Sequence, residues 1–301
     1  MTPSLRDGLV VASHRRHFAV RADDGSIVNC VLKGRTLTLA CGDRVRFESA
    51  ASGGAIVAIE PRTTLFYRSD AFKEKLIAAN VTQVIGVVAP DISVDEELVN
   101  RWLVAAEDQQ CRMVLVANKA DRPGFPALLD RLDAFAALGY PVVPVAAITD
   151  IAPLLPWLDG HRSALVGQSG MGKSTILNAV IPGASARTAE ISAALEAGRH
   201  TTTHSTLYPL PATMTQGWIV DSPGVKAFGL AHISPDSIAE AFVEMRPYFG
   251  RCRFRDCSHG SEPDCALRGA IASGGIAPHR LELMRSLITE SKAVRAPGRR
   301  S

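Results

Sequence analysis

The amino-acid sequence predicts a multidomain protein with an N-terminal β-barrel, a central α/β domain and a C-terminal helical module that carries a Cys/His cluster. Its 301 residues exceed the length at which a single hydrophobic core usually stops growing. Short strand-like segments begin the chain, continuous apolar runs follow them, and three of the six cysteines gather near the C-terminus. We therefore expect three domains, over residues 1–62, 63–233 and 234–301.

Composition and charge exclude several classes of protein. Hydrophobic residues make up 47% of the chain and charged residues 21%, which argues against a disordered or coiled-coil protein. No apolar run is long enough to span a membrane, and residues 1–7 lack the core of a signal peptide. We therefore expect a cytoplasmic protein that has no membrane partner.

The formal net charge of +3 conceals an uneven distribution of charge. Residues 1–62 carry nine Lys/Arg and six Asp/Glu, residues 63–245 carry thirteen and nineteen, and residues 246–301 carry eleven and five. Basic flanks with net charges of +3 and +6 thus enclose a middle segment of −6. They suggest an anionic partner such as nucleic acid, although a solubilising surface would explain them equally well.

The first domain shows the pattern of short strands separated by turn residues. The strand-like segments are residues 8–11, 17–21, 27–32 and 44–47, with turns expected at residues 23–26, 41–43 and 52–54. Four or five strands at this spacing predict a small barrel, and an OB-fold is the leading candidate. A barrel without a ligand is the alternative that the pattern leaves open.

The central domain shows continuous apolar runs, which are typical of parallel strands buried on both faces. These runs are residues 84–89, 113–117, 164–166 and 218–220. Residues 96–108 and 127–138 are suited to the crossover helices that parallel strands require. The layout predicts an α/β nucleotide-binding domain.

A phosphate-binding loop follows one of these runs. Gly167, Gln168, Ser169, Gly170, Met171, Gly172, Lys173 and Ser174 match the pattern G-x-x-x-x-G-K-[ST], and Thr175 continues into a segment that can open a helix. The glycines let the backbone N–H groups converge on phosphate oxygens at the helix N-terminus. Lys173 would neutralise the β- and γ-phosphates, and the Ser174 hydroxyl would bind Mg²⁺.

Two further motifs indicate the base and the metal. Asn118, Lys119, Ala120 and Asp121 form an N-K-x-D motif directly after a strand. The carboxylate of Asp121 can accept hydrogen bonds from guanine N1–H and its exocyclic amine, whereas adenine offers neither donor at these positions. Asp221 and Gly224 belong to a D-x-x-G motif, in which the carboxylate would reach Mg²⁺ through water and the glycine amide would sense the γ-phosphate.

The C-terminal cluster has the composition of a structural zinc site. Cys252, Cys257, His259 and Cys265 offer three thiolates and one imidazole, a closed tetrahedral set for one Zn²⁺ ion. Arg251, Arg253 and Arg255 interleave these residues, and Arg268 follows. Such a loop suits RNA phosphates, with Phe254 either stacking on a base or packing in the core.

The order of the motifs is unusual, because N-K-x-D precedes the phosphate-binding loop. In this respect the chain resembles the circularly permuted GTPases. With the N-terminal barrel and the Cys/His cluster, it resembles the ribosome small-subunit-dependent GTPase A family over residues 8–290. One departure is the loop that ends in Ala146 and Ala147, where the family usually has a Ser-Ala-like dipeptide and a side-chain hydroxyl.

The resemblance implies a function. It implies a monomer that binds GTP and GDP with Mg²⁺, contacts the small ribosomal subunit and its rRNA through an RNA-binding barrel and a zinc module, and assists late maturation of that subunit. Hydrolysis of GTP would be slow alone and faster on the subunit. The alternatives are a nucleotide-gated RNA-binding clamp with little turnover and a generic P-loop ATPase.

The catalytic group is the least determined part of the site. Residues 198–204 lie where switch I belongs, and Thr201, Thr202 and Thr203 are equal candidates for the second hydroxyl on Mg²⁺. Position 225 is Val, which cannot orient water as the Gln of many GTPases does. Our hypothesis is that His200 approaches the γ-phosphate when switch I becomes ordered; the rival hypothesis is that a partner supplies the missing group.

Overall fold

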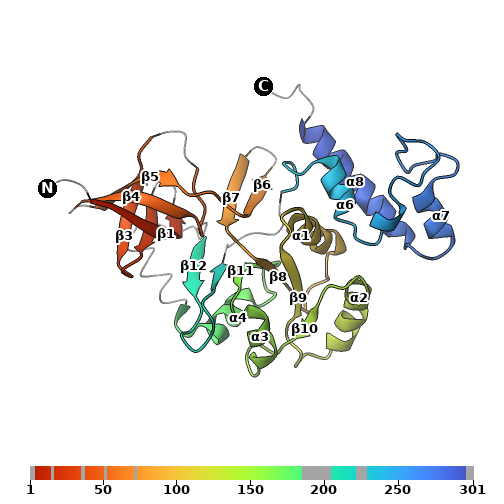
Figure 1. The fold of residues 1–301 in the computed structure, drawn as a ribbon. Coiled ribbons are helices and arrows are strands. Elements are labelled where there is room, and N and C mark those ends of the chain that lie inside the picture. The colour runs from red at the N-terminus through yellow and green to blue at the C-terminus, as the bar shows by residue number, and fades with distance from the viewer. Residues whose placement is uncertain are drawn as a thin grey trace.

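The computed structural model describes residues 4–14, 17–34, 38–50, 53–70, 73–184, 205–221 and 229–295. An N-terminal barrel, a central α/β domain and a C-terminal helical module lie side by side, with the α/β domain in the middle (Figure 1). Within the described residues, no helix combines the length and the apolar character that crossing a bilayer requires.

The barrel is closed by five strands. They are β1 (Ser4–His14), β2 (His17–Ala22), β3 (Ile27–Leu32), β4 (Arg44–Ala50) and β5 (Gly53–Ile59). β1 pairs with both β2 and β4, β3 pairs with β2 and in parallel with β5, and β4 pairs with β5. This closed five-stranded arrangement is the expected OB-fold.

One expectation about the barrel is wrong, because Gly53 and Gly54 begin strand β5 and do not form a turn. A Cβ atom at Gly54 would lie 2.5 Å from the Cys30 sulfur and 3.1 Å from the Phe47 ring. The glycine therefore lets the parallel strands approach a tightly packed core, which is a recognised use of glycine within a strand.

The central sheet has six strands in the order β10-β9-β8-β11-β13-β12, all parallel except for β12. The strands are β8 (Gln83–Val88), β9 (Arg112–Ala117), β10 (Val142–Pro144), β11 (Arg162–Val166), β12 (Thr206–Pro209) and β13 (Trp218–Asp221). All six residues of β8 are buried, as the continuous apolar run predicts.

Helices cover both faces of this sheet. α1 (Glu96–Asp108) and α2 (Phe125–Ala137) belong to one hydrophobic core, and η1 (Ala152–Leu154), α3 (Leu155–Leu158) and α4 (Lys173–Val180) belong to the other. Asp95 caps α1 by accepting a hydrogen bond from the Leu98 N–H, so the helix has the expected bounds. α2 begins two residues earlier than expected, because Pro126 is tolerated in a first turn.

The barrel is joined to the sheet through its own strands. β1 pairs with β12 at Ala12 and Thr206, and the Ala79 N–H donates to the Cys41 carbonyl at 2.8 Å. A hairpin of β6 (Leu65–Asp70) and β7 (Lys73–Ala79) leads from the barrel to β8. The sequence pattern did not predict this hairpin.

The C-terminal module shares a core with the α/β domain. It contains α6 (Pro235–Glu240), η2 (Arg246–Tyr248), α7 (Ala266–Ala272) and α8 (Pro278–Arg295). Leu281, Met284 and Leu287 of α8 are buried in the same core as Trp102 of α1, as their helical spacing predicts. The module is therefore packed against α1 and not tethered loosely behind it.

Candidate functional site

Residues 167–174 form a glycine-lined turn between β11 and α4. Gly167, Gly170 and Gly172 have φ angles of 151°, 84° and 94°, a region that side chains with a Cβ rarely adopt. A Cβ atom at Gly167 would lie 2.6 Å from the Val87 carbonyl oxygen, and one at Gly172 would collide with the Asn118 amide. Glycine is therefore strongly favoured at these positions, and a side chain at Gly167 or Gly172 would force the turn to shift.

Lys173, the first residue of α4, brings a cation to this turn. Its Nζ donates hydrogen bonds to the carbonyls of Gly167 at 2.7 Å and Gln168 at 2.9 Å. Burial lowers the pKa of this amine, and the nearby carboxylate of Asp221 opposes that effect. The charge is thus held inside the loop, in the position from which it can neutralise a phosphate.

The first turn of α4 offers polar groups that face solvent. Ser174 and Thr175 are exposed, whereas Ile176, Leu177 and Val180 are buried and anchor the helix to the sheet. The helix N-terminus therefore presents its free N–H groups and a hydroxyl on the same side as the Lys173 ammonium.

Asn118 connects three loops. It is buried; its Nδ2 donates to the Met171 carbonyl at 2.9 Å, and its Oδ1 accepts from the Ala147 N–H at 3.2 Å. The Ala120 N–H donates to the Val145 carbonyl at 3.0 Å. The N-K-x-D motif, the phosphate-binding loop and the loop after β10 are thereby held as one unit.

Lys119 and Asp121 complete this motif in different ways. Lys119 has a φ of 65°, and its Nζ donates to the Gly170 carbonyl at 2.8 Å and to Asp91 at 2.6 Å. Asp121 is exposed, and its Oδ2 lies 3.6 Å from the Arg122 Nε. Its carboxylate is accessible to a ligand that offers two N–H donors.

Asp221 ends β13, which lies beside β11 in the sheet. Burial raises the pKa of this carboxyl, and the charge of Lys173 lowers it. The three motifs lie together at the carboxyl ends of parallel strands, where open α/β sheets bind their ligands. They are residues 118–121 after β9, residues 167–174 after β11 and Asp221 at the end of β13. With the exposed Ser174 hydroxyl, this carboxylate could hold a hard cation such as Mg²⁺.

The other expected residues of this site lie outside the described residues. These are His200, Thr201, Thr202, Thr203 and Gly224. Sequence reasoning missed Asp91, which lies three residues after the end of β8 and holds Lys119 in place. Its position after a buried parallel strand, like that of Asn118 after β9, was the available signal.

The Cys/His cluster brings four ligand atoms together, all within 4.8 Å of one another. The sulfurs of Cys252 and Cys265 are 3.9 Å apart, and the His259 Nδ1 lies 3.5 Å from each of them. A tetrahedral zinc ion with Zn–S bonds of about 2.3 Å requires a sulfur–sulfur separation of about 3.8 Å. Burial lowers the pKa of His259 and favours the neutral imidazole, which is the form that binds metal. The four residues therefore fit a structural zinc ion.

The loop around the Cys/His cluster is stabilised by hydrogen bonds to a carboxylate and carries an arginine beside an aromatic ring. The Glu262 carboxylate accepts hydrogen bonds from Ser258 and from the Gly260 N–H, and these bonds lower its pKa to about 2. The Phe254 side chain is 41% exposed, so it does not pack in the core. The guanidinium of Arg253 lies 5.6 Å from the centroid of its ring. An exposed aromatic ring with a cation over it is suited to stacking on a base.

Comparison with known proteins gives consistent matches. A model of the family described as RsgA GTPase matches residues 59–231. The chain is 48% identical to the Small ribosomal subunit biogenesis GTPase RsgA of Nitrosospira multiformis, over 98% of this chain and 94% of that protein. It is 45% identical to the protein of the same name from Nitrosomonas europaea, over 93% and 90% of the two chains.

Two solved structures are similar along almost the full chain. The crystal structure of YjeQ from Thermotoga maritima is 29% identical and matches with a TM-score of 0.71, over 99% of this chain and 100% of that one. YloQ, whose structure is described as that of a circularly permuted GTPase, matches with a TM-score of 0.67 over 98% and 97% of the two chains. At 20% identity, YloQ supports the permuted fold alone.

Proposed function

The chain belongs to the RsgA GTPase family, and on that premise we propose that it acts in the biogenesis of the small ribosomal subunit. It is a GTPase, which converts GTP to GDP and phosphate. In the proposed function it binds the small subunit and its rRNA, the subunit stimulates hydrolysis, and the cycle assists late maturation of the subunit.

The observation that carries this proposal is the direct connection between the phosphate-binding loop and the N-K-x-D motif. Asn118 donates to the Met171 carbonyl and Lys119 to the Gly170 carbonyl, so the two motifs cannot move independently. A ligand that spans them must carry phosphates at one end and a base at the other. Asp121 selects guanine for that base.

The proposed nucleotide site follows from this arrangement. Residues 167–175 surround the phosphates, Lys173 neutralises the β- and γ-phosphates, and residues 118–121 hold the base. Mg²⁺ is bound with GTP by Ser174, by Asp221 through water, and by one of Thr201, Thr202 and Thr203, while the Gly224 amide senses the γ-phosphate.

The flanking domains supply the proposed RNA contacts. Residues 1–62 form an RNA-binding OB domain, residues 63–233 the permuted GTPase domain and residues 234–301 the zinc domain. One Zn²⁺ ion bound by Cys252, Cys257, His259 and Cys265 fixes the loop that displays Phe254 and its neighbouring arginines. The protein works as a monomer in the cytoplasm, where the small subunit is assembled.

One experiment tests partner, base and catalysis together. Small subunits are sedimented with the protein in GTP, GDP or ATP, and phosphate release is followed in single turnovers with and without subunits. We expect association and hydrolysis that depend on guanine nucleotide, with faster release on subunits. Association without stimulation would favour the nucleotide-gated clamp, and equal use of ATP would contradict the role of Asp121.

His200 is the proposed catalytic group. The substitution His200→Ala should lower the turnover on small subunits by orders of magnitude and leave the GTP affinity little changed, because the imidazole acts only when switch I is ordered. His161→Ala is a control, since this histidine lies directly before β11 and beside Thr82, at the opposite end of that strand from the phosphate-binding loop. Unchanged turnover in His200→Ala would favour a catalytic group supplied by the subunit.

A further inference from the structure

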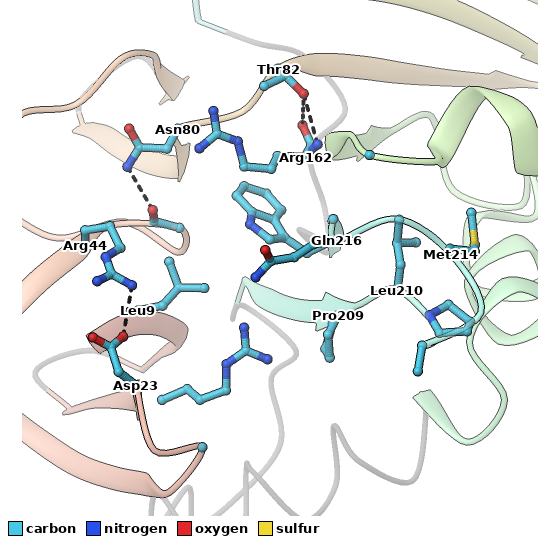
Figure 2. A pocket seen from close by; sticks show the side chains of 18 of the residues that line it. Leu9, Asp23, Arg44, Asn80, Thr82, Arg162, Pro209, Leu210, Met214 and Gln216 are labelled. Atoms are coloured by element: carbon cyan, nitrogen blue, oxygen red, sulfur yellow. Dashed lines mark hydrogen bonds and ion pairs between the residues drawn. The ribbon is translucent and has the colours of Figure 1, made fainter. Parts of the chain in front are cut away.

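A cleft lies between the barrel and the α/β domain, with a volume of about 880 Å³. The barrel contributes β2, the turn after it and the start of β4; the α/β domain contributes the start of β11 and the connection between β12 and β13 (Figure 2). Volumes of this size, at a junction of domains, are typical of small-molecule sites.

Two of the cations in the cleft have no acidic partner among the described residues. Among its three arginines, Arg44 is paired with Asp23 at 3.1 Å and with Glu60 at 3.9 Å. Arg21 of β2 and Arg162 of β11 are half-buried, and in the part of the chain that the structure describes their guanidinium groups have neither an ion pair nor a side-chain hydrogen bond. Two half-buried guanidinium groups on opposite domains form a site for an anion, and their planar forks match phosphate.

The rest of the wall combines apolar side chains with polar ones, among them the amide of Gln216. Leu210, Met214 and Trp218 line the α/β side of the cleft. Leu9 lies on the opposite side, on β1 (Figure 2). Gln216 is exposed, and its amide, which points into the cleft (Figure 2), offers both a donor and an acceptor. Such a wall suits a planar base whose edge meets Gln216, while Arg21 and Arg162 hold the phosphate.

We propose that this cleft is a second nucleotide site, which binds a ribonucleotide through its phosphate. The phosphate can belong to a free mononucleotide or to a nucleotide within an RNA chain, since the groups that recognise it are the same. The proposal goes beyond the GTPase function and does not depend on it.

The cleft is separate from the phosphate-binding loop. β11 begins at Arg162 and ends at Val166, directly before Gly167, so the two sites lie at opposite ends of a strand about 15 Å long. β13 runs in parallel, from Trp218 in the cleft to Asp221 at the other end. A nucleotide can therefore occupy each site at the same time.

The test is equilibrium dialysis of the full-length protein with adenosine 5′-monophosphate, and separately with octauridylate, in excess GDP. GDP fills the phosphate-binding loop, and Asp121 disfavours adenine there. We expect saturable binding of one or both probes, weakened about tenfold by Arg21→Gln and by Arg162→Gln, because each removes a charged hydrogen-bonding fork. Binding of both probes identifies a site open to free nucleotides, and binding of octauridylate alone identifies RNA as the source.

Arg46→Gln is the matched control, because Arg46 is an exposed arginine of β4 that does not line the cleft. This variant should bind the probes as the wild type does, and all variants should retain GDP affinity and the unfolding temperature. The proposal is overturned if neither probe binds, if Arg21→Gln and Arg162→Gln bind the probes as the wild type does, or if all three arginine variants weaken binding equally.

Discussion

Asp221 experiences two opposite effects on the same carboxyl group. Burial favours its protonated form and raises its pKa, and the ammonium of Lys173 favours its ionised form. Burial is the larger effect, so the group takes up a proton at a higher pH than an ordinary aspartic acid. The ionised form is the stronger acceptor for a water on Mg²⁺, because its negative charge strengthens the hydrogen bond.

Magnesium-dependent GTP affinity should therefore fall as the pH falls through the raised pKa of Asp221. The affinity falls in this direction because the pKa of Asp221 is raised. Protonation of Asp221 in the free protein then competes with metal binding. Titration by fluorescence or calorimetry, from neutral pH down to the range in which an ordinary aspartic acid titrates, measures this loss of affinity. The Asp221→Asn variant should bind GTP in the presence of Mg²⁺ about tenfold more weakly than the wild type at neutral pH. Its remaining pH dependence reports the nucleotide's own titration, and an identical profile in the two proteins would contradict the assignment.

Asp121 should determine the choice of base. Asp121→Asn replaces two acceptors by one acceptor and a donor, so the affinity for GTP should fall about a hundredfold and that for xanthosine triphosphate should rise. Competition binding against a fluorescent nucleotide measures both. Asp130→Asn, at an exposed acid of α2, is the control for lost charge. Parallel losses for both triphosphates would point to a structural role for Asp121.

The helices of the C-terminal module are fastened to α1 by a buried polar contact. The Arg280 Nε donates to Glu244 at 2.6 Å, and its Nη1 donates to the Asn100 amide oxygen. The side chains of Arg280 and Glu244 are only 10% and 11% exposed. Arg280 also lies over the Phe242 ring, at 4.8 Å from the centroid. This arginine thus connects α8, the segment after α6, and α1.

Arg280→Met should destabilise the protein by about 3–5 kcal/mol, because it leaves the Glu244 carboxylate buried without a counter-charge. Arg253→Met is the matched control. Its pair with Asp264 is 64% and 69% exposed, so the expected loss is below about 1 kcal/mol. Denaturant unfolding of both variants measures the difference, and equal losses would show that the buried pair is not a fastening contact.

The three domains form a continuous structure because β1 extends the central sheet and α8 extends its helical layer. Gly42 lies at the first of these junctions. It has a φ of 92°; its N–H donates to the Val10 carbonyl at 2.9 Å, and its carbonyl accepts from the Asn80 amide at 2.9 Å. A Cβ atom there would collide with the Ala79 carbonyl.

Gly42→Ala should therefore separate the barrel from the sheet. We expect a cost of about 3 kcal/mol from backbone strain and overpacking together, read as a lower unfolding temperature. Gly25→Ala is the control, since Gly25 has a φ of 86° with nothing within 4 Å of an added Cβ. The Gly25→Ala variant therefore measures the cost of backbone strain alone, which we expect to be about 1 kcal/mol. Equal shifts in the two variants would mean that the junction tolerates a side chain.

Much of the fold could be predicted from the sequence where the signal is local. The apolar run of residues 84–89 predicts β8, and the helical periodicity of Leu281, Met284 and Leu287 predicts α8. The hairpin of β6 and β7 was missed, because its strands lack a continuous apolar run. The start of β5 was mistaken for a turn, because Gly53 and Gly54 serve close packing, which neighbours in sequence cannot reveal.

By itself, the sequence determined the chemistry of each motif: a glycine turn before a lysine, a carboxylate after a strand, and three thiols with an imidazole. These features depend on residues that are adjacent in the chain. Only the tertiary structure decided which of them meet. Asn118 reaches Met171 across 53 positions, Asp91 secures Lys119, and Arg21 and Arg162 line one cleft from two domains. Such contacts arise when strands pair and domains pack, and no local pattern encodes the distance between groups far apart in the chain.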